Sequence, residues 1–329
     1  MIRLTTRTIG FVALLGSLSA CDAPPPSALD PDPWLGEIEF RGTRPWPPPG
    51  GTLNTAWLGD SPLMRLIIGP VPIERTTDSD VVVQSVDLLV DGHYESVPTS
   101  NVELDGSELV VSIADVEYRG EGLEGSRWRL SGPGGGFIEI VGVDSHDGLY
   151  NYLLDYHSPR MQPAQPTEVC AAPSGGSQWT YMVGDVAVDA QATITDEPGT
   201  LLVACVSGAL GKAIDWGFTP WADQRPLYQA GIRTILADYC GNGTSHTADG
   251  IPIQVANAAA GKMFTDADAP TEAVFGPDGA LCLSEFRFSS VRLAHSSASC
   301  SIPSCGSDMD VEALMSGAST RAWTKLDED

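Results

Sequence analysis

Apolar and polar residues alternate in short runs through residues 36–165, which is typical of β-strands that have one buried face. One long run, residues 81–90, contains a short polar break and is followed by Asp91-Gly92, a dipeptide favoured in tight hairpin turns. Two further Asp-Gly pairs, at 105–106 and 147–148, also separate apolar runs. The spacing predicts an N-terminal antiparallel β domain over residues 36–165, built as a sandwich or a small barrel.

Residues 166–329 combine strand and helix patterns. Trp179 to Ala190 alternates and Leu201 to Ala204 is wholly apolar, and both patterns predict strands. Proline and glycine crowd residues 159–176, so we place the domain boundary between residues 165 and 166. The expected fold class is α+β and rich in β structure, with a small α+β domain in the second half of the chain.

Apolar residues at helical spacing predict three helices in this second half. The first spans residues 208–215 and is followed by Gly217, which suits a helix C-terminus. The second starts near Pro226, because proline is common in the first turn of a helix, and it ends near Asp238. The third follows Asp308, which we expect to be its capping residue.

Residues 1–20 have the features of a secretory signal: two arginines and no acidic residue, a short apolar core, and small residues before Cys21. The apolar core is much shorter than the roughly 20 residues that a membrane-spanning helix needs. Small residues directly before a cysteine resemble a bacterial lipobox, which implies cleavage before Cys21 and acylation of that cysteine. Residues 21–35 are acidic and rich in proline, which predicts an extended tether. We therefore expect an extracytoplasmic protein of the cell envelope, lipid-anchored at the outer membrane or the periplasmic face.

The chain has seven cysteines, and the six that follow Cys21 all lie in its second half: Cys170, Cys205, Cys240, Cys282, Cys300 and Cys305. An even number in an exported chain predicts disulfide bonds, although the sequence does not choose among the pairings. A structural zinc site would need paired short cysteine spacings with histidines nearby, and the chain has none. We expect disulfides in the second domain, no metal site and no cofactor.

The chain is strongly acidic, with 18 basic and 43 acidic residues and a net charge of −25. This charge repels the phosphates of nucleic acids, so nucleic-acid binding is excluded as a class of function. An apolar content of 42% is enough for packed cores. The expected partners are the membrane, through the lipid anchor, and a protein or glycan of the envelope.

Four short sequence motifs occur in the second half of the chain. Residues 216–221 read Trp-Gly-Phe-Thr-Pro-Trp, and residues 236–247 read Leu-Ala-Asp-Tyr-Cys-Gly-Asn-Gly-Thr-Ser-His-Thr. Gly-Ile-Pro-Ile follows at residues 250–253 and Pro-Asp-Gly-Ala-Leu-Cys at residues 277–282. Together they resemble the ADYC domain, which is named for Ala237, Asp238, Tyr239 and Cys240. The resemblance covers residues 165–315. It implies a lipoprotein or secreted protein of the kind found mainly in myxobacteria, and it implies no catalytic role.

Asp238, Tyr239, Cys240 and His246 are close in sequence, as catalytic groups can be. A nucleophilic Cys240 would need a free thiol, whereas export predicts a bonded sulfur. Asp238 stands at a helix end before Gly-Asn-Gly and is expected to hydrogen-bond that turn. We therefore predict no catalytic residue and a non-enzymatic structural or binding role. The alternative is an extracytoplasmic hydrolase of unfamiliar type, with a site formed by a carboxylate and either His246 or His157.

Overall fold

The computed structural model describes residues 52–53, 55–59, 65–69, 81–131, 135–159, 166–170, 178–257, 259–261, 264, 268–287, 300–316 and 320–326. The chain divides into residues 1–41, all outside these ranges, and residues 42–329, to which the description below belongs. The predictions for residues 1–35, including the signal segment, Cys21 and the tether, lie outside the described residues.

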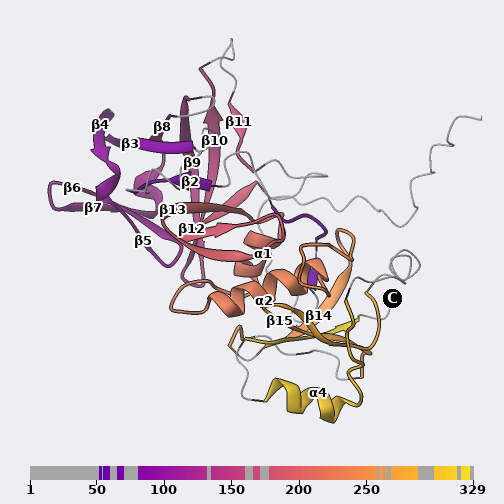
Figure 1. Cartoon of the computed structure of the whole chain (residues 1–329). Helices are drawn as coiled ribbons and strands as arrows, with labels where there is room; N and C mark the ends of the chain where they lie inside the picture. The colour runs from indigo at the N-terminus through magenta and orange to yellow at the C-terminus, as the bar shows by residue number, and fades with distance from the viewer. Residues whose placement is uncertain are drawn as a thin grey trace, which may run out of the picture. The chain divides into compact units, whose positions relative to one another are not determined.

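Seven strands pair in a closed ring, which makes a small barrel (Figure 1). In ring order they are β10 (Leu149–His157), β12 (Trp179–Val188), β13 (Ile194–Cys205), β2 (Arg65–Ile67), β3 (Val81–Val90), β8 (Arg127–Ser131) and β9 (Phe137–His146), which pairs back with β10. Among these strands, only β2 and β3 run parallel. Two further strands lie outside the ring. β4 (His93–Pro98) pairs with β3, and β11 (Thr167–Glu168) pairs with β10. The predicted β-rich fold with antiparallel sheets is confirmed.

The strands of the barrel wall bury both of their faces near the helices. On β13, Leu201 and Val203 belong to the core inside the barrel, together with Trp128. Leu202 lies between Leu201 and Val203 in the sequence and Ala204 follows them. Both belong to a second core, to which the helices also contribute side chains. Successive side chains on a strand point to opposite faces, so a strand covered on both sides reads as a continuous apolar run.

A three-stranded sheet packs against the barrel core. It consists of β5 (Val102–Asp105), β6 (Glu108–Ile113) and β7 (Val116–Arg119), with Leu109 and Val111 inside the core. A buried tyrosine joins the two sheets: Tyr152 on β10 accepts a hydrogen bond at 2.7 Å from the backbone N of Leu109. Burial raises the pKa of Tyr152 far above its ordinary value. Short 3₁₀ turns at Thr99–Asn101 and Gly120–Leu123 connect these strands to the barrel.

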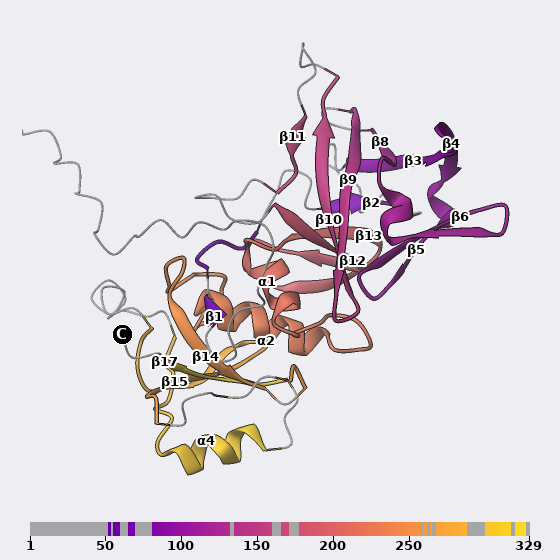
Figure 2. The same ribbon diagram turned by 180° about the vertical axis from the view of Figure 1, so that it is seen from behind.

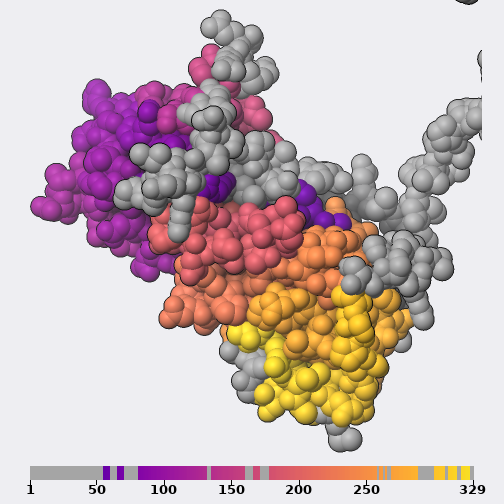
Figure 3. Space-filling view, viewed as in Figure 1, coloured from indigo at the N-terminus to yellow at the C-terminus, as the bar shows by residue number. Residues whose placement is uncertain are grey.

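A second, five-stranded sheet combines a strand from the start of the described residues with four strands from the C-terminal part of the chain. Its order is β1 (Thr52–Leu53), β14 (Pro252–Ala256), β17 (Ala322–Leu326), β15 (Thr271–Gly276) and β16 (Gly279–Leu283), all antiparallel. Helix α1 (Ala209–Asp215) packs on β13, α2 (Arg225–Leu236) packs on α1 and β15, and α4 (Asp308–Met315) packs on β15 and β17. Figure 2 shows α2 beside this sheet on one side and α4 on the other. In the space-filling view, atoms of the helical region adjoin those of the C-terminal strands (Figure 3).

The three predicted helices are present, with one corrected boundary. Gly217, with φ 87°, lets the backbone N of Phe218 bond to the carbonyl of Ala213 and so closes α1. The capping residue of α4 is Ser307, one residue before the predicted Asp308. The Asp310 carboxylate accepts hydrogen bonds from the hydroxyl and the backbone N of Ser307, and these bonds lower the pKa of Asp310.

Strands from both sides of residue 165 take part in the barrel. β8, β9 and β10 precede this residue, whereas β12 and β13 follow it. The division into domains at residues 165 and 166 stays a prediction, and the barrel itself includes residues of both parts.

Candidate functional site

The Ala237-Asp238-Tyr239-Cys240 motif begins where α2 ends. Ala237 adopts a left-handed conformation, with φ 49° and ψ 42°, which residues with a side chain rarely do. Its backbone N donates to the carbonyl of Thr234, and the backbone N of Asp238 donates to the carbonyl of Arg233 at 2.9 Å. These bonds cap the helix and turn the chain back, which brings the next three side chains of the motif against α2 and the second sheet.

Asp238 is fully buried and forms an ion pair with Arg233, which lies one turn earlier on α2. As expected from the sequence, its carboxylate also accepts hydrogen bonds from the turn, at 3.1 Å from the backbone N of Asn242 and 2.7 Å from that of Gly243. A buried charge is tolerated when it is paired and its remaining lone pairs are satisfied. Asp238 thus fastens the Gly-Asn-Gly turn to the helix.

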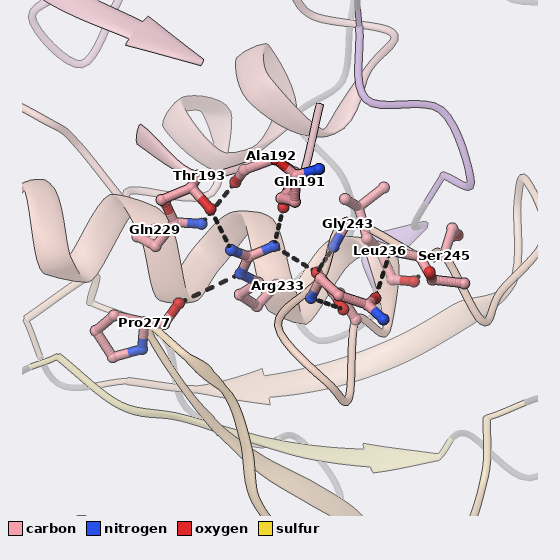
Figure 4. Close-up of polar contacts among 12 residues, drawn as sticks. Gln191, Ala192, Thr193, Gln229, Arg233, Leu236, Gly243, Ser245 and Pro277 are labelled. Carbon is pink, nitrogen blue, oxygen red and sulfur yellow. Dashed lines mark hydrogen bonds and ion pairs between the residues drawn. The ribbon is translucent and has the colours of Figure 1, made fainter. Parts of the chain in front are cut away.

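Arg233 extends this network to two further segments. Its guanidinium donates to the carbonyl of Gln191 at 2.6 Å, to the hydroxyl of Thr193 at 3.1 Å and to the carbonyl of Pro277 at 3.3 Å. Figure 4 shows the guanidinium at the centre of these contacts, between the loop before β13 and the turn before β16. One side chain therefore joins α2, the ADYC turn, the barrel and the second sheet.

Tyr239 belongs to a second buried ionic cluster. Its hydroxyl donates to Glu272 at 2.8 Å and accepts from the backbone N of Arg287 at 3.0 Å. Glu272 and Arg287 form a doubly hydrogen-bonded ion pair with neither side chain exposed. Burial, and then the negative charge of Glu272, raise the pKa of Tyr239 well above its ordinary value. The phenol therefore stays protonated and acts as a hydrogen-bond donor in the core.

Arg287 also caps α2. Its terminal nitrogens donate to the carbonyls of Thr234 at 2.8 Å and Ile235 at 3.1 Å. These carbonyls belong to the last turn of the helix, where the regular hydrogen bonds of the helix run out, and a cation there is favoured by the helix dipole. Both buried arginines thus stabilise the same helix end.

The histidines proposed for a hydrolase have separate surroundings. His246 is 4% exposed, its Nδ1 lies 3.0 Å from the carbonyl oxygen of Ala237, and its ring packs on Tyr239. His157 is on β10 of the barrel, where it stacks on Phe137 and its Nε2 lies 3.7 Å from a carboxylate oxygen of Glu139. These contacts place His246 against the helix end, whereas His157 lies beside the carboxylate of Glu139.

All six cysteines after Cys21 are paired. The bonds are Cys170–Cys205 inside the barrel, Cys240–Cys300 at the ADYC motif and Cys282–Cys305 under α4. The predicted disulfide bonding is confirmed, and bonded sulfurs are not nucleophiles. Disulfides form and persist in oxidising compartments, so the protein is extracytoplasmic.

Sequence reasoning missed most partners of the motif. Arg233 was not singled out, although an arginine on a predicted helix, five residues before an aspartate at the helix end, is a usable signal in the sequence. Arg287 has no such signal, because its partner Glu272 and the helix end are reached only through the fold. The contact of Tyr181 with Asp215 and His146 was also missed.

No group of three or more His, Cys, Asp or Glu side chains among the described residues is arranged to hold a metal ion. Likewise, none of the described helices is long and apolar enough to span a membrane.

The chain is thus a β-rich, disulfide-bonded extracytoplasmic protein in which two buried ion pairs hold the end of α2. A family model, the ADYC domain, matches residues 107–289, more than half of the chain, and the chain belongs to this family. The match starts in the three-stranded sheet and includes barrel strands, so it begins before residue 165 and ends before residue 315, the limits of the resemblance read from the motifs. Comparisons with curated proteins and with solved structures find no match.

Proposed function

We propose that this chain is a lipid-anchored module of the cell envelope with a non-enzymatic role, either structural or in binding an envelope protein or glycan. Two independent features support the proposal. One is the signal segment that ends at Cys21, and the other is the use of the ADYC side chains inside the protein.

The observation that supports a non-enzymatic role most strongly is the engagement of the motif. Asp238 and Tyr239 are 0% and 2% exposed, and their polar atoms bond to Arg233, Glu272 and the backbone. Cys240 is in a disulfide. A catalytic group must reach a substrate atom directly or through one water. These side chains therefore stabilise a helix end, and a binding partner would contact other residues at the surface of the protein.

The anchor is supported by the sequence around Cys21 and by the oxidising compartment that the disulfides require. The test compares the full chain with Cys21→Ser in a bacterial host that is fed labelled palmitate. The native chain should incorporate the label, partition with membranes and accumulate as precursor with globomycin. Cys21→Ser should lose the label while keeping its disulfides. Normal secretion of an unlabelled native chain would contradict the proposal.

The alternative, an extracytoplasmic hydrolase with a histidine–carboxylate site, is favoured by one contact. His157 and Glu139 are each about one-fifth exposed and lie 3.7 Å apart. Purified native protein and His157→Ala should behave alike against ester, peptide and glycoside substrates, with no turnover above buffer. Turnover that His157→Ala removes, with the fold unchanged by circular dichroism, would favour the hydrolase.

A further inference from the structure

The three disulfides differ in exposure. Cys170, Cys205, Cys282 and Cys305 are between 0% and 3% exposed, each inside a hydrophobic core. Cys240 and Cys300 are both partly exposed. Thiol–disulfide exchange requires an incoming thiolate to reach a sulfur atom, so access separates these bonds.

The chain that follows each of these two cysteines reaches the surface. Asn242 is exposed two residues after Cys240, and Ser301, Pro303 and Ser304 are exposed after Cys300. By contrast, Cys282 and Cys305 pack with Val274, Val311 and Trp323 under α4. Among the described residues, Cys240–Cys300 is therefore more accessible to a reductant than the two disulfides in the hydrophobic cores.

Opening this bond leaves other attachments in place on each side. The ADYC turn is held by Asp238 through Arg233, Asn242 and Gly243. The segment after Cys300 is held by the bond from the backbone N of Leu283 to the carbonyl of Pro303, at 2.9 Å, and by Cys282–Cys305. These contacts do not depend on the Cys240–Cys300 bond.

We propose that Cys240–Cys300 is a thiol–disulfide exchange site whose reaction partner is an extracytoplasmic dithiol. One thiolate of the dithiol attacks a sulfur of the bond, forms a mixed disulfide and releases the other cysteine as a thiolate, which takes a proton. The second thiol of the partner then attacks the mixed disulfide. The products are two cysteine thiols in this protein and one disulfide in the partner, so two electrons pass from the dithiol to the protein.

The test uses the folded, oxidised full chain with limiting dithiothreitol as the probe dithiol. Samples are quenched over time with N-ethylmaleimide, and the labelled cysteines are identified by peptide mass spectrometry. Cys240 and Cys300 should be labelled together and about ten times faster than the other four cysteines, because those are shielded from thiolates. The near-ultraviolet circular dichroism of the barrel should persist through this first phase.

A paired variant keeps the result specific. Cys240→Ser with Cys300→Ser should abolish the fast phase and leave the slow labelling of the other cysteines unchanged. Equal or earlier labelling of either other pair in the native chain would overturn the proposal. So would labelling of Cys240 and Cys300 that begins only when the circular dichroism signal is lost.

Discussion

At the scale of single residues, two arginines determine how α2 ends. Arg233 pairs with Asp238 and Arg287 pairs with Glu272, and the four side chains are 0–2% exposed. The sequence indicated that Asp238 would bond the turn after it, because aspartate before Gly-Asn-Gly favours such bonds. It gave no indication of Arg287, because this residue is far from α2 in the sequence and meets the helix end only in the folded chain. Local polar chemistry was therefore predictable, and the long-range half of the site was not.

Removing the carboxylate of Asp238 should leave the buried guanidinium of Arg233 without its ion-pair partner. We expect Asp238→Ala to lower the free energy of unfolding by about 3–5 kcal/mol, measured by urea denaturation at neutral pH, because Arg233 would keep its charge without a partner. The matched control is Asp196→Ala, which removes an exposed partner of Arg225 and should change stability little. Equal effects of the two substitutions would show that the Asp238 pair has no special role.

Three buried tyrosines predict loss of stability at alkaline pH. Burial raises the pKa values of Tyr152, Tyr228 and Tyr239 in the folded protein above the ordinary value near 10. Above that pH the unfolded chain loses these protons and the folded chain keeps them, so stability falls as pH rises. Each tyrosine adds about 1.4 kcal/mol per pH unit to the slope.

The measurement for this prediction is the urea midpoint as a function of pH from neutral to alkaline. Tyr228→Phe keeps the ring but removes one titrating group, so its slope should be shallower than that of the native chain. A midpoint that stays constant above the tyrosine pKa would contradict the assigned burial.

At the scale of elements, turns and helix ends were the most predictable features. Asp91-Gly92 and Asp147-Gly148 form hairpin turns with positive φ at both residues, which asparagine, aspartate and glycine tolerate best. The Ala114-Asp115 turn between β6 and β7 was missed, because alanine gives no such signal. Of the two strands, β6 places Leu109 and Val111 in the core, so this hairpin is anchored through β6.

Glycine at position 231 should be required by the packing of α2. A Cβ atom added there would meet Cβ and Cγ of Phe218 at 2.6 Å, and Phe218 is fully buried. We expect Gly231→Ala to lower the melting temperature, since overpacking costs about 1–3 kcal/mol and exceeds the roughly 1 kcal/mol that alanine gains in a helix.

The comparison for this prediction is Gly122→Ala, where an added Cβ would have no atom within 4 Å. Its melting temperature should match or exceed that of the native chain. A Gly231→Ala protein as stable as Gly122→Ala would show that Phe218 moves aside freely.

At the scale of the whole molecule, the barrel depends on pairings between distant strands. Leu66 on β2 is opposite Leu201 on β13, and β9 returns to β10 to complete the ring. The apolar runs predicted most of these strands individually. No local pattern reports which strands meet across such separations, so the sequence left sandwich and barrel as alternatives.

This dependence predicts the behaviour of a fragment. Residues 36–165 lack β12 and β13, so the ring would be open and β2 and β10 would each lose a neighbour. We expect this fragment to lack the near-ultraviolet circular dichroism of the full chain and to aggregate, because exposed strand edges pair with other chains. A monomeric fragment with a cooperative melting transition would instead support an independent domain.

The most direct test of the account is a disulfide map of the unreduced protein, obtained by proteolysis and mass spectrometry. We expect Cys170–Cys205, Cys240–Cys300 and Cys282–Cys305, with no free thiol among these six cysteines. A free thiol at Cys240, or a bond from Cys240 to any cysteine other than Cys300, would contradict the structural role assigned to the ADYC motif.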